Sequence, residues 1–441
     1  MADQRMSTPK FLPEEITLNI FTRLPADLVL DCKLVRKTWR NFVKLFHSKT
    51  TYFAYQHLWR HCGRGLIQQH EQLHNLYHND FDSAKLSFVF WNRDAQALDY
   101  MEYHEEGESN RDKQLANYYT RKINFKFPLE AYEFVGTCNG LICISVKTAH
   151  VSYREEPEPK PALYICNPIT KEFISLPGLG INKEKLDKND GVHIVHGFGY
   201  DPQTNKYKVV RVLYFGVDYK NSFKGSHVEV YTLGSGCGWR SAGETNYFVD
   251  PSFGAASICV NGALHWILGR TPKIVVFDLA DEKFHLLPAP PGVPYCGKLF
   301  VMKGCLCLGE AYRKLGQYWK WDLWYLKNNE EESSSSSCQE GEHYYSFWSW
   351  RKEFRTLGTI DFKESYCEPF AITNKGEVLL FANYLGDISL HNPETNTATP
   401  KQIRNFFEYC SPGMEMPIPH INSFVSLNAL GAENVRTNIV D

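Results

Sequence analysis

The feature of this sequence that most restricts its fold is a regular alternation of short apolar runs and tight turns, which starts near residue 86. Runs rich in Val, Ile, Leu, Phe and Tyr follow one another at spacings of about 8–12 residues, as they do in sheet proteins. The pairs Asn139-Gly140 and Asn261-Gly262 accept the positive φ angles that a two-residue hairpin needs. Aromatic residues make up 14% of the chain, and flat rings pack well on pleated surfaces. The sequence therefore predicts an all-β sandwich, barrel or propeller.

Two kinds of repeated segment favour a propeller among these folds. One is a hairpin, "TCNGLICIS" at 137–145 and "CVNGALHWI" at 259–267. The other is a strand, a turn and a second strand, "LYICNPITKEFISLP" at 163–177 and "VVFDLADEKFHLLPAP" at 275–290. A hairpin followed by such a segment makes one four-stranded blade, and repeats of about 40–50 residues are typical of propellers.

The repeats also predict how the blades are distributed along the chain. We expect five blades between residues 132 and 400, and a sixth that closes when a strand near residues 86–103 pairs with a late strand at Phe424–Leu427. The fold predicted for residues 86–430 is thus an all-β domain, a propeller of about six four-stranded blades. The acidic, Ser-rich stretch at residues 328–345 has no means of packing and is predicted to be a disordered insertion.

The first 50 residues follow a helical pattern instead. Pro13 before Glu14 and Glu15 is typical of a helix start, and Pro25 ends that helix and can open the next. About 35 residues are too few to enclose their own core, so an apolar face of these helices packs either on the β-domain or on another protein. The apolar residues at helical spacing form three stripes: Leu12, Ile16, Ile20 and Leu24; Leu28, Leu30 and Leu34; and Val35, Trp39, Phe42, Val43 and Phe46.

These patterns divide the chain into successive parts. Short apolar runs replace the helical pattern only after a polar, His-rich stretch, which we predict to be a linker. The predicted parts are a disordered N-terminus (1–9), a small all-α three-helix unit (10–50), a helical linker (51–85), the β-domain (86–430) and a flexible C-terminus (431–441).

Charge and cysteine content exclude several functions. The formal net charge is −2, so we expect no binding to nucleic acid through overall charge. No run approaches the 18 or so apolar residues of a membrane helix, and the N-terminal residues lack the apolar stretch of a signal peptide. The 13 Cys are scattered without a C-x-x-C pair, which indicates reduced thiols. We expect a protein of the cytoplasm or nucleus that binds no membrane.

One motif points to catalysis. His70, Glu71 and His74 match H-E-x-x-H, in which two His bind zinc and the Glu activates water. Catalytic zinc needs a third protein ligand in a walled cleft, and Tyr77 stands where the longer protease signature requires Gly. We therefore favour a solvated or partly packed helix as the explanation of the motif. No nucleophile elbow or phosphate-binding loop occurs, and we expect no cofactor, no metal and no enzymatic activity.

Two blocks of the sequence resemble a known plant family. Phe11–Lys44, "FLPEEITLNIFTRLPADLVLDCKLVRKTWRNFVK", resembles an F-box, with a departure at Asp31–Leu34, where plant members more often carry a small-Leu-x-Arg stretch. The segments "GTCNGLICI", "ICNPITKEFISLP" and "GFGYDPQTNKYKVVRV" are similar to the plant F-box-associated domain, a kelch-like propeller. The resemblance implies an F-box followed by a C-terminal F-box-associated domain.

The resemblance also implies a function and partners. An F-box docks on a Skp-family adaptor and through it on a cullin and a RING subunit, while the β-domain recruits a target protein for ubiquitination and proteasomal degradation. The chain would then be the non-catalytic substrate-recognition subunit of an SCF-type ubiquitin ligase, with an unidentified substrate. The alternatives are a free-standing propeller scaffold and, last, the zinc hydrolase. The residues that the resemblance assigns to adaptor binding are Leu12, Pro13, Ile16, Ile20, Leu24, Pro25, Leu34, Val35 and Trp39.

Overall fold

The computed structural model describes most of the β-domain and part of the N-terminal helices. The predicted insertion at residues 328–345, apart from residue 328, and most of the predicted linker lie outside this description. The described residues are 14–24, 26–35, 39, 41, 54, 57, 86–92, 97–103, 118–123, 132–146, 163–178, 192–218, 222–250, 257–268, 273–293, 297–302, 304–312, 320–328, 348–355, 367–373, 376–382, 387–392 and 417–437.

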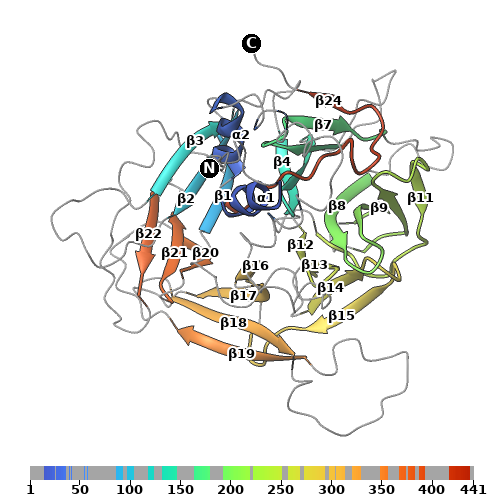
Figure 1. The fold of residues 1–441 in the computed structure, drawn as a ribbon. Helices are drawn as coiled ribbons and strands as arrows, with labels where there is room; N and C mark the ends of the chain where they lie inside the picture. Colours follow the sequence, from blue (N-terminus) through green and yellow to red (C-terminus); the bar gives the residue numbers. More distant parts are fainter. Residues whose placement is uncertain are drawn as a thin grey trace, which may run out of the picture.

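The described strands form six antiparallel sheets, which follow one another around a common centre as in a propeller (Figure 1). We number them in chain order. Sheet 1 contains β1 (Leu86–Asn92), β2 (Ala97–Tyr103), β3 (Tyr118–Ile123) and the late strand β23 (Ile418–Pro419). Sheet 2 contains β4 (Tyr132–Cys138), β5 (Leu141–Val146), β6 (Leu163–Asn167), β7 (Glu172–Ser175) and the late strand β24 (Arg436–Thr437).

The other four sheets are each built from consecutive strands. Their first strands β8, β12, β16 and β20 lie nearest the centre of the ring in Figure 1. Sheet 3 contains β8 (Val192–Asp201), β9 (Lys206–Phe215), β10 (Gly225–Thr232) and β11 (Trp239–Ser241), and sheet 4 contains β12 (Ile258–Val260), β13 (Ala263–Ile267), β14 (Lys273–Asp278) and β15 (Phe284–Pro288). Sheet 5 contains β16 (Lys298–Met302), β17 (Cys305–Tyr312), β18 (Lys320–Asn328) and β19 (Trp348–Arg355), and sheet 6 contains β20 (Cys367–Ile372), β21 (Val378–Ala382) and β22 (Asp387–His391).

Five sheets therefore lie between residues 132 and 400, as the repeats predict. Strands β3 and β11 were not predicted, because neither Tyr118–Ile123 nor Trp239–Ser241 is an apolar run. The core lies between neighbouring sheets, where alternate strand residues of both sheets interdigitate and exclude water. Each of the six junctions holds its own cluster: Val89 with Ile142, Ile165 with Phe198, Val212 with Val275, Ile274 with Leu308, Leu323 with Ile372, and Phe88 with Phe370.

Local sequence explains the hairpins. Asn139 and Gly140 have φ angles of 49° and 85°, and Asn261 and Gly262 have 52° and 75°. Positive φ at both turn residues is what a tight two-residue hairpin demands, and Asn-Gly adopts it with little strain. The prediction of these two turns is confirmed.

The second repeated segment forms one recurring turn. The side-chain Oδ1 of Asn167 accepts hydrogen bonds from the backbone N–H groups two and three residues later. Asp201 and Asp278 make the same pair of bonds in sheets 3 and 4. These bonds replace backbone partners at the corner between two strands, which is why Asn and Asp stand at this position of the repeat.

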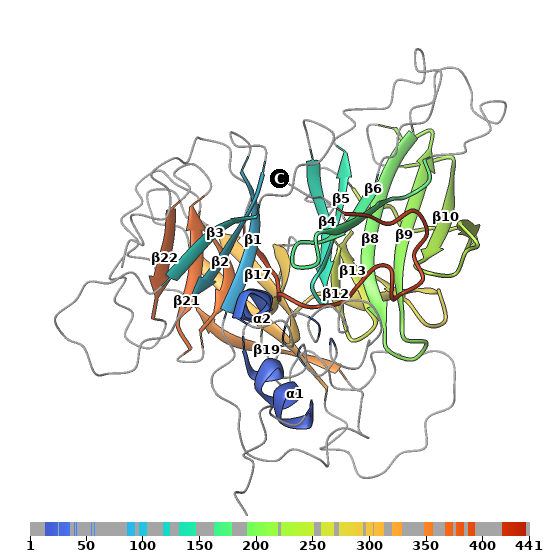
Figure 2. The same cartoon turned by 45° about the horizontal axis from the view of Figure 1, so that its top comes forward.

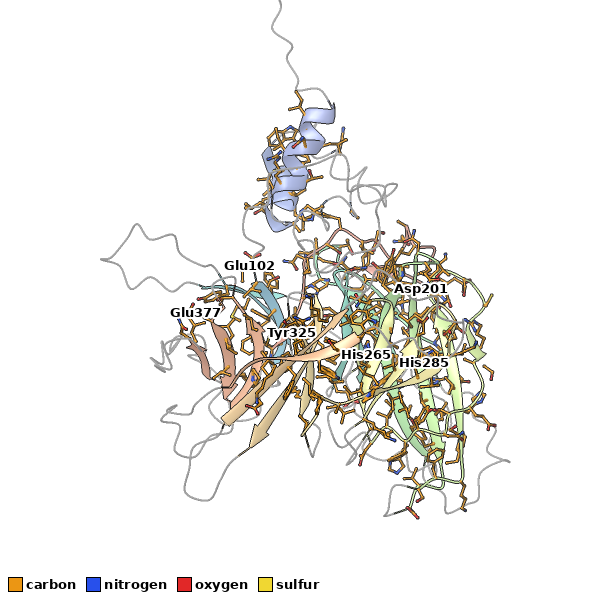
Figure 3. All side chains as sticks on the ribbon, turned by 90° about the horizontal axis from the view of Figure 1, so that it is seen from below. Glu102, Asp201, His265, His285, Tyr325 and Glu377 are labelled. Atoms are coloured by element: carbon orange, nitrogen blue, oxygen red, sulfur yellow. The ribbon has the colours of Figure 1, made fainter. Side chains whose placement is uncertain are left out.

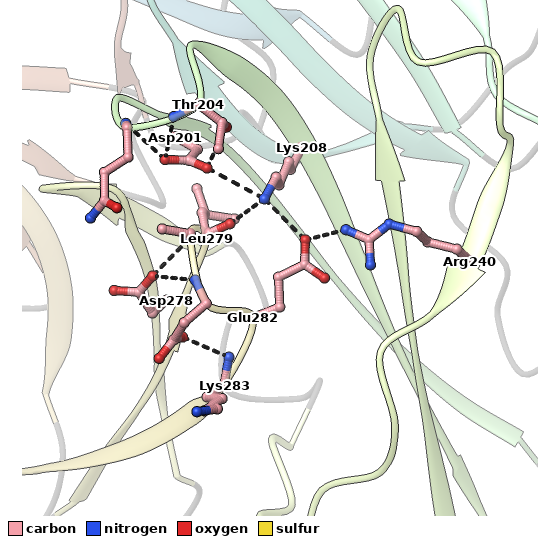
Figure 4. A network of polar contacts seen from close by, with 11 residues as sticks. Asp201, Thr204, Lys208, Arg240, Asp278, Leu279, Glu282 and Lys283 are labelled. Atoms are coloured by element: carbon pink, nitrogen blue, oxygen red, sulfur yellow. Dashed lines mark hydrogen bonds and ion pairs between the residues drawn. The ribbon is translucent and has the colours of Figure 1, made fainter. Parts of the chain in front are cut away.

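A charged network joins sheets 3 and 4 at these turns (Figure 4). The buried Lys208 Nζ lies 3.4 Å from Asp201 Oδ2 and 3.0 Å from Glu282 Oε1, and it also donates to the Leu279 carbonyl. Arg240 pairs with the same carboxylate of Glu282. Desolvation alone would raise the pKa of Glu282, but hydrogen bonds from Arg240 and Lys208 outweigh it and leave that pKa lowered.

The C-terminal residues 417–437, which we call the strap, close the ring. Strand β23 pairs with β1 of sheet 1, and β24 pairs with β7 of sheet 2. The sequence correctly predicted that a late segment completes the first sheet, but it placed the pairing at Phe424–Leu427. Those residues form no strand; they are irregular and buried, and the paired residues are Ile418 and Pro419.

Polar side chains of sheet 2 bind the strap. Asn167 Nδ2 donates to the carbonyls of Ser423 and Val425 at 3.0 and 2.7 Å. The buried Glu172 carboxylate accepts from the Leu427 N–H at 2.6 Å and from the Ser426 hydroxyl at 2.9 Å. Buried polar atoms need such partners, so the irregular backbone of the strap is stable in the interior.

The end of the strap also differs from expectation. The sequence predicts a flexible C-terminus from residue 431, because the last ten residues carry no strand pattern. Arg436 and Thr437 instead pair with Phe173 and Glu172 of sheet 2, and Gly431 lies beside Gly234 of the loop after β10.

Candidate docking surface on the helical pair

Helix α1 (Glu14–Arg23) has one buried and one exposed face. Thr17 and Phe21, four residues apart, are buried, and Phe21 is completely inaccessible. Ile16 and Ile20, also four residues apart, are 48% and 38% exposed. Residues at this spacing lie on the same side of a helix. The helix thus presents two isoleucines to solvent.

Helix α2 (Ala26–Val35) is apolar on both faces. Ala26, Val29 and Cys32, spaced three residues apart, are buried. Leu28 and Leu34 are 47% and 79% exposed. We call Ile16, Ile20, Leu28 and Leu34 the exposed apolar set. They are the exposed large apolar side chains in the part of the chain that the structure describes.

The buried faces of both helices pack on the propeller. Phe21 and Val29 belong to the same cluster as Val135 and Ile165 of sheet 2 and Leu427 of the strap. The helices lie over one end of the ring, close to its centre (Figures 1 and 3), and Figure 2 shows α1 and α2 on the same side of the sheets. The covered face therefore has a partner within the chain, whereas the exposed apolar set has none among the described residues.

His57 connects the helices with the strap. Its Nε2–H donates to the Leu24 carbonyl at the end of α1 over 2.8 Å, since a carbonyl can only accept. Its ring meets Phe424 of the strap edge-on, with centroids 5.0 Å apart. Trp39 packs edge-on against Phe21 at 5.4 Å. The two contacts of His57 connect the end of α1 with the strap.

The structure divides the predicted docking residues into groups. Ile16, Ile20 and Leu34 are exposed and free to meet another protein. Leu24 and Trp39 are half-buried and pack inward, so they support the surface and do not form it. Val35 lies at the end of α2, and its side chain is outside the description. Leu12, Pro13 and Pro25 lie outside the described residues.

Leu28 is the exposed residue that the prediction left out. It stands in the second apolar stripe, so the sequence did mark it as apolar. Apolar residues occur on more than one side of α2, however. The sequence of such a helix does not indicate which face is buried.

The zinc motif cannot be assessed from this structure. His70, Glu71 and His74 lie outside the described residues. Among the residues that are described, no three or more His, Cys, Asp or Glu side chains gather as a metal site would require. The described helices are also too short to cross a membrane.

Three described tryptophans donate hydrogen bonds to backbone carbonyls far away in the sequence. Trp266 is buried and donates to the His196 carbonyl at 3.4 Å. Trp350 Nε1 donates to the carbonyl of Pro288 on the preceding sheet at 2.7 Å. Trp239 makes the equivalent bond to Pro177 at 2.9 Å. Trp239 and Trp350 stand on the outermost strands of sheets 3 and 5, whereas Trp266 connects β13 of sheet 4 with β8 of sheet 3.

The described ring of sheets, with a pair of helices on one end, defines a propeller with two appended helices. The family described as the F-box associated beta propeller domain matches residues 85–409, and the chain belongs to that family. Its relatives include the Arabidopsis thaliana F-box protein At3g07870, 28% identical over 72% of this chain, and F-box protein DOR, 26% identical over 65%. The matches span 69% and 65% of those two proteins.

Similarity to solved structures adds little. A chain of a nidogen/laminin complex aligns with 77% of this chain and 99% of its own length, at 10% identity and a TM-score of 0.37. That score is too low to support the fold assignment, which comes from the sheets themselves and from the family match.

Proposed function

We propose that this chain is the substrate-recognition subunit of an SCF-type ubiquitin ligase and that it is non-catalytic. The observation that carries the proposal is the exposed apolar set on α1 and α2, which the described part of the chain leaves exposed. Membership of the F-box associated propeller family and similarity to plant F-box proteins support it. In this proposal the six sheets are the six blades of one propeller, and the protein acts in the cytoplasm or nucleus.

The adaptor-binding site is proposed on the exposed apolar set. Ile16, Ile20 and Leu34 belong to the residues that the F-box resemblance assigns to this role, and Leu28 joins them from the structure. A helix pair that lays apolar side chains into a partner's groove is a common mode of recognition. Residues 1–60 hold 10 Lys and Arg against 5 Asp and Glu, and this excess would speed association with an acidic Skp-family adaptor.

The propeller would hold the target protein. Binding residues lie mainly on loops, and many loops of this chain are outside the described residues, so the substrate class is left open. The free-standing scaffold is the remaining alternative. It requires helices that are covered completely by the propeller, and four large exposed apolar residues argue against that.

The test is a direct binding measurement. Purified full-length protein and the double variant Ile20→Ser/Leu34→Ser are titrated with a purified Skp-family adaptor by calorimetry. We expect the double variant to bind at least about tenfold more weakly, because a few central apolar residues dominate such interfaces. Leu28→Ser tests the added residue.

The matched control is Asp31→Asn, an exposed position on the same helix α2, which should keep wild-type affinity. Equal affinities for wild type and the double variant would refute the proposed surface. Failure of the folded wild-type protein to bind any Skp-family adaptor would refute the ligase role and favour the scaffold.

A further inference from the structure

Two cysteines from different sheets meet near the centre of the propeller. Cys138 is the last residue of β4 in sheet 2, and Cys259 is the middle residue of β12 in sheet 4. Their thiols are joined by a hydrogen bond, although 121 positions of sequence separate them. Both residues are half-buried, in contrast to the fully buried cysteines of the core.

The strand between them is shaped to allow this contact. β4, β8 and β12 lie against one another at the centre of the ring. A side chain at Gly199 of β8 would place its Cβ 2.5 Å from the Cys259 sulfur, a distance that no real contact tolerates. Gly199 therefore leaves room for the sulfur, and the backbone of the next residue, Tyr200, hydrogen-bonds to the Cys259 thiol.

The groups around Cys259 stabilise its thiolate relative to its thiol. The hydrogen bond with Cys138 lowers the pKa of Cys259, burial opposes this, and the Tyr200 backbone adds to the lowering. The thiolate is the reactive form of cysteine in oxidation and disulfide formation. Cys259 thus combines activation, partial access and a second thiol within contact distance.

A second pair of cysteines has the opposite character. Cys143 on β5 and Cys166 on β6 occupy neighbouring paired strands of sheet 2, and both side chains are fully inaccessible. Burial raises the pKa of both thiols. They are inert small apolar residues of the core and provide an internal control.

We propose that Cys138 and Cys259 form a peroxide-sensitive dithiol site, which a hydroperoxide converts into a disulfide between sheets 2 and 4. The proposal is independent of the ligase role. Cys138 and Cys259 stand on β4 and β12, whereas the proposed adaptor site lies on α1 and α2.

The reaction balances with hydrogen peroxide as the oxidant. The Cys259 thiolate attacks one peroxide oxygen, the O–O bond breaks, and the leaving hydroxide takes up a proton to become water. The Cys138 thiolate then attacks the sulfur of the Cys259 sulfenic acid, the S–O bond breaks, and the released hydroxide takes the proton that Cys138 has given up. Two thiols lose two electrons in total, and one peroxide becomes two waters.

The test uses full-length reduced protein treated with a small molar excess of hydrogen peroxide. Remaining thiols are blocked with N-ethylmaleimide under denaturing conditions, and tryptic peptides are identified by mass spectrometry. We expect one cross-linked species, in which the peptide that contains Cys138 and Cys143 joins the peptide that contains Cys259. A thiol reductant should remove it.

Variants assign the partner of Cys259. Cys138→Ser should abolish the cross-link, and the matched variant Cys143→Ser should leave it intact. A cross-link that survives in Cys138→Ser, or no cross-link in the wild-type protein, would overturn the proposal.

A second measurement needs no variant. In native wild-type protein, iodoacetamide should alkylate Cys259 at least about tenfold faster than Cys143 and Cys166 at neutral pH, because its thiolate fraction and access are greater. Equal slow labelling of all three thiols would also overturn the proposal, whatever the variants do.

Discussion

At the scale of single residues, one side chain of the recurring turn stabilises both the turn itself and a contact with a distant segment of the chain. Asn167 Oδ1 bonds the turn of sheet 2, while its Nδ2 bonds two carbonyls of the strap. Asp201 and Asp278 make the turn bonds with a carboxylate, which has no donor. The choice of Asn in sheet 2 is therefore explained by the strap, since only an amide can serve both partners.

Replacing Asn167 tests this double role. Asn167→Ala should lower the free energy of unfolding by about 3 kcal/mol. It removes the acceptor for the two turn N–H groups and the donor to the two strap carbonyls. Asn167→Asp keeps the turn acceptor but places a carboxylate against two carbonyls, so it should be destabilising too. Urea unfolding measures both.

The control is Gln203→Ala on the equivalent turn of sheet 3, where the side chain is exposed and the change should stay within about 0.5 kcal/mol. An Asn167→Asp variant as stable as wild type would show that the strap contact is energetically unimportant.

Buried histidines should make the fold sensitive to mild acid. Desolvation lowers the pKa of His420 to about 3 and that of His265 to about 4, both from the ordinary 6.5. Below about pH 6.5 these histidines become protonated in the unfolded chain but stay neutral in the folded chain. The free energy of unfolding therefore decreases as the pH falls from 6.5 towards the lowered pKa values. Each histidine should cost up to about 1.4 kcal/mol per pH unit in that range.

The measurement is urea unfolding at pH 7, 6 and 5, with His420→Leu beside wild type. The free energy of unfolding of the variant should depend less steeply on pH than that of wild type. The difference in slope should correspond to about one proton. If both proteins have the same slope, His420 is not held neutral in the folded state.

At the scale of elements, two outer strands carry the same brace. Trp239 of β11 and Trp350 of β19 each donate an indole N–H to a proline carbonyl at the end of the preceding sheet's outer strand. Arg211 also lies over the Trp239 ring, 4.0 Å from its centre, and this buried Arg pairs with Glu229. The brace therefore connects sheets 2 and 3, and sheets 4 and 5.

Trp350→Phe should remove one hydrogen bond while keeping most of the ring, and cost about 1 kcal/mol of stability. Trp239→Phe should cost more, because it also weakens the contact with the Arg211 guanidinium. Guanidinium unfolding of the two variants compares them directly. An equal or smaller loss for Trp239→Phe would contradict the stacking contribution.

The elements also show where sequence prediction succeeds and where it stops. Asn-Gly hairpins and Asx turns depend on residues within five positions of one another, so most strands over residues 132–400 were predictable. The short strand β11 was not, because Trp239–Ser241 is not an apolar run. The brace of Trp350 on Pro288 and the contact of His57 with Phe424 join residues far apart in the chain. No local pattern encodes them, and the exposure of Leu28 depends on which face of α2 the propeller covers.

At the scale of the whole molecule, the strap holds the ring and the helices together. It supplies a strand to sheet 1 and a strand to sheet 2, and its Phe424 packs against His57 beneath α1. The position of α1 and α2 relative to the propeller thus depends on residues near the other end of the chain. A propeller leaves only the short outer strands of its sheets as free edges.

Deleting residues 417–441 should open sheet 1 and lower the midpoint of thermal unfolding by more than about 5 °C, since two strands and the buried Phe424, Val425 and Leu427 are lost. Limited proteolysis should then cut first within residues 86–123. Deleting only residues 438–441 is the control and should leave both measurements unchanged. If the variant that lacks residues 417–441 resists heat and protease as well as wild type does, the strap does not hold the ring closed.

The strap also determines when the molecule can finish folding. Strand β1 emerges from the ribosome early, but the segment that pairs with it is made only after the strands of all other sheets. Until then sheet 1 has an unprotected edge and the helices lack the phenylalanine beneath them. Ring closure must therefore follow synthesis of these late residues, and a message that ends prematurely before residue 417 would release an aggregation-prone open ring for degradation by the cell's own quality control.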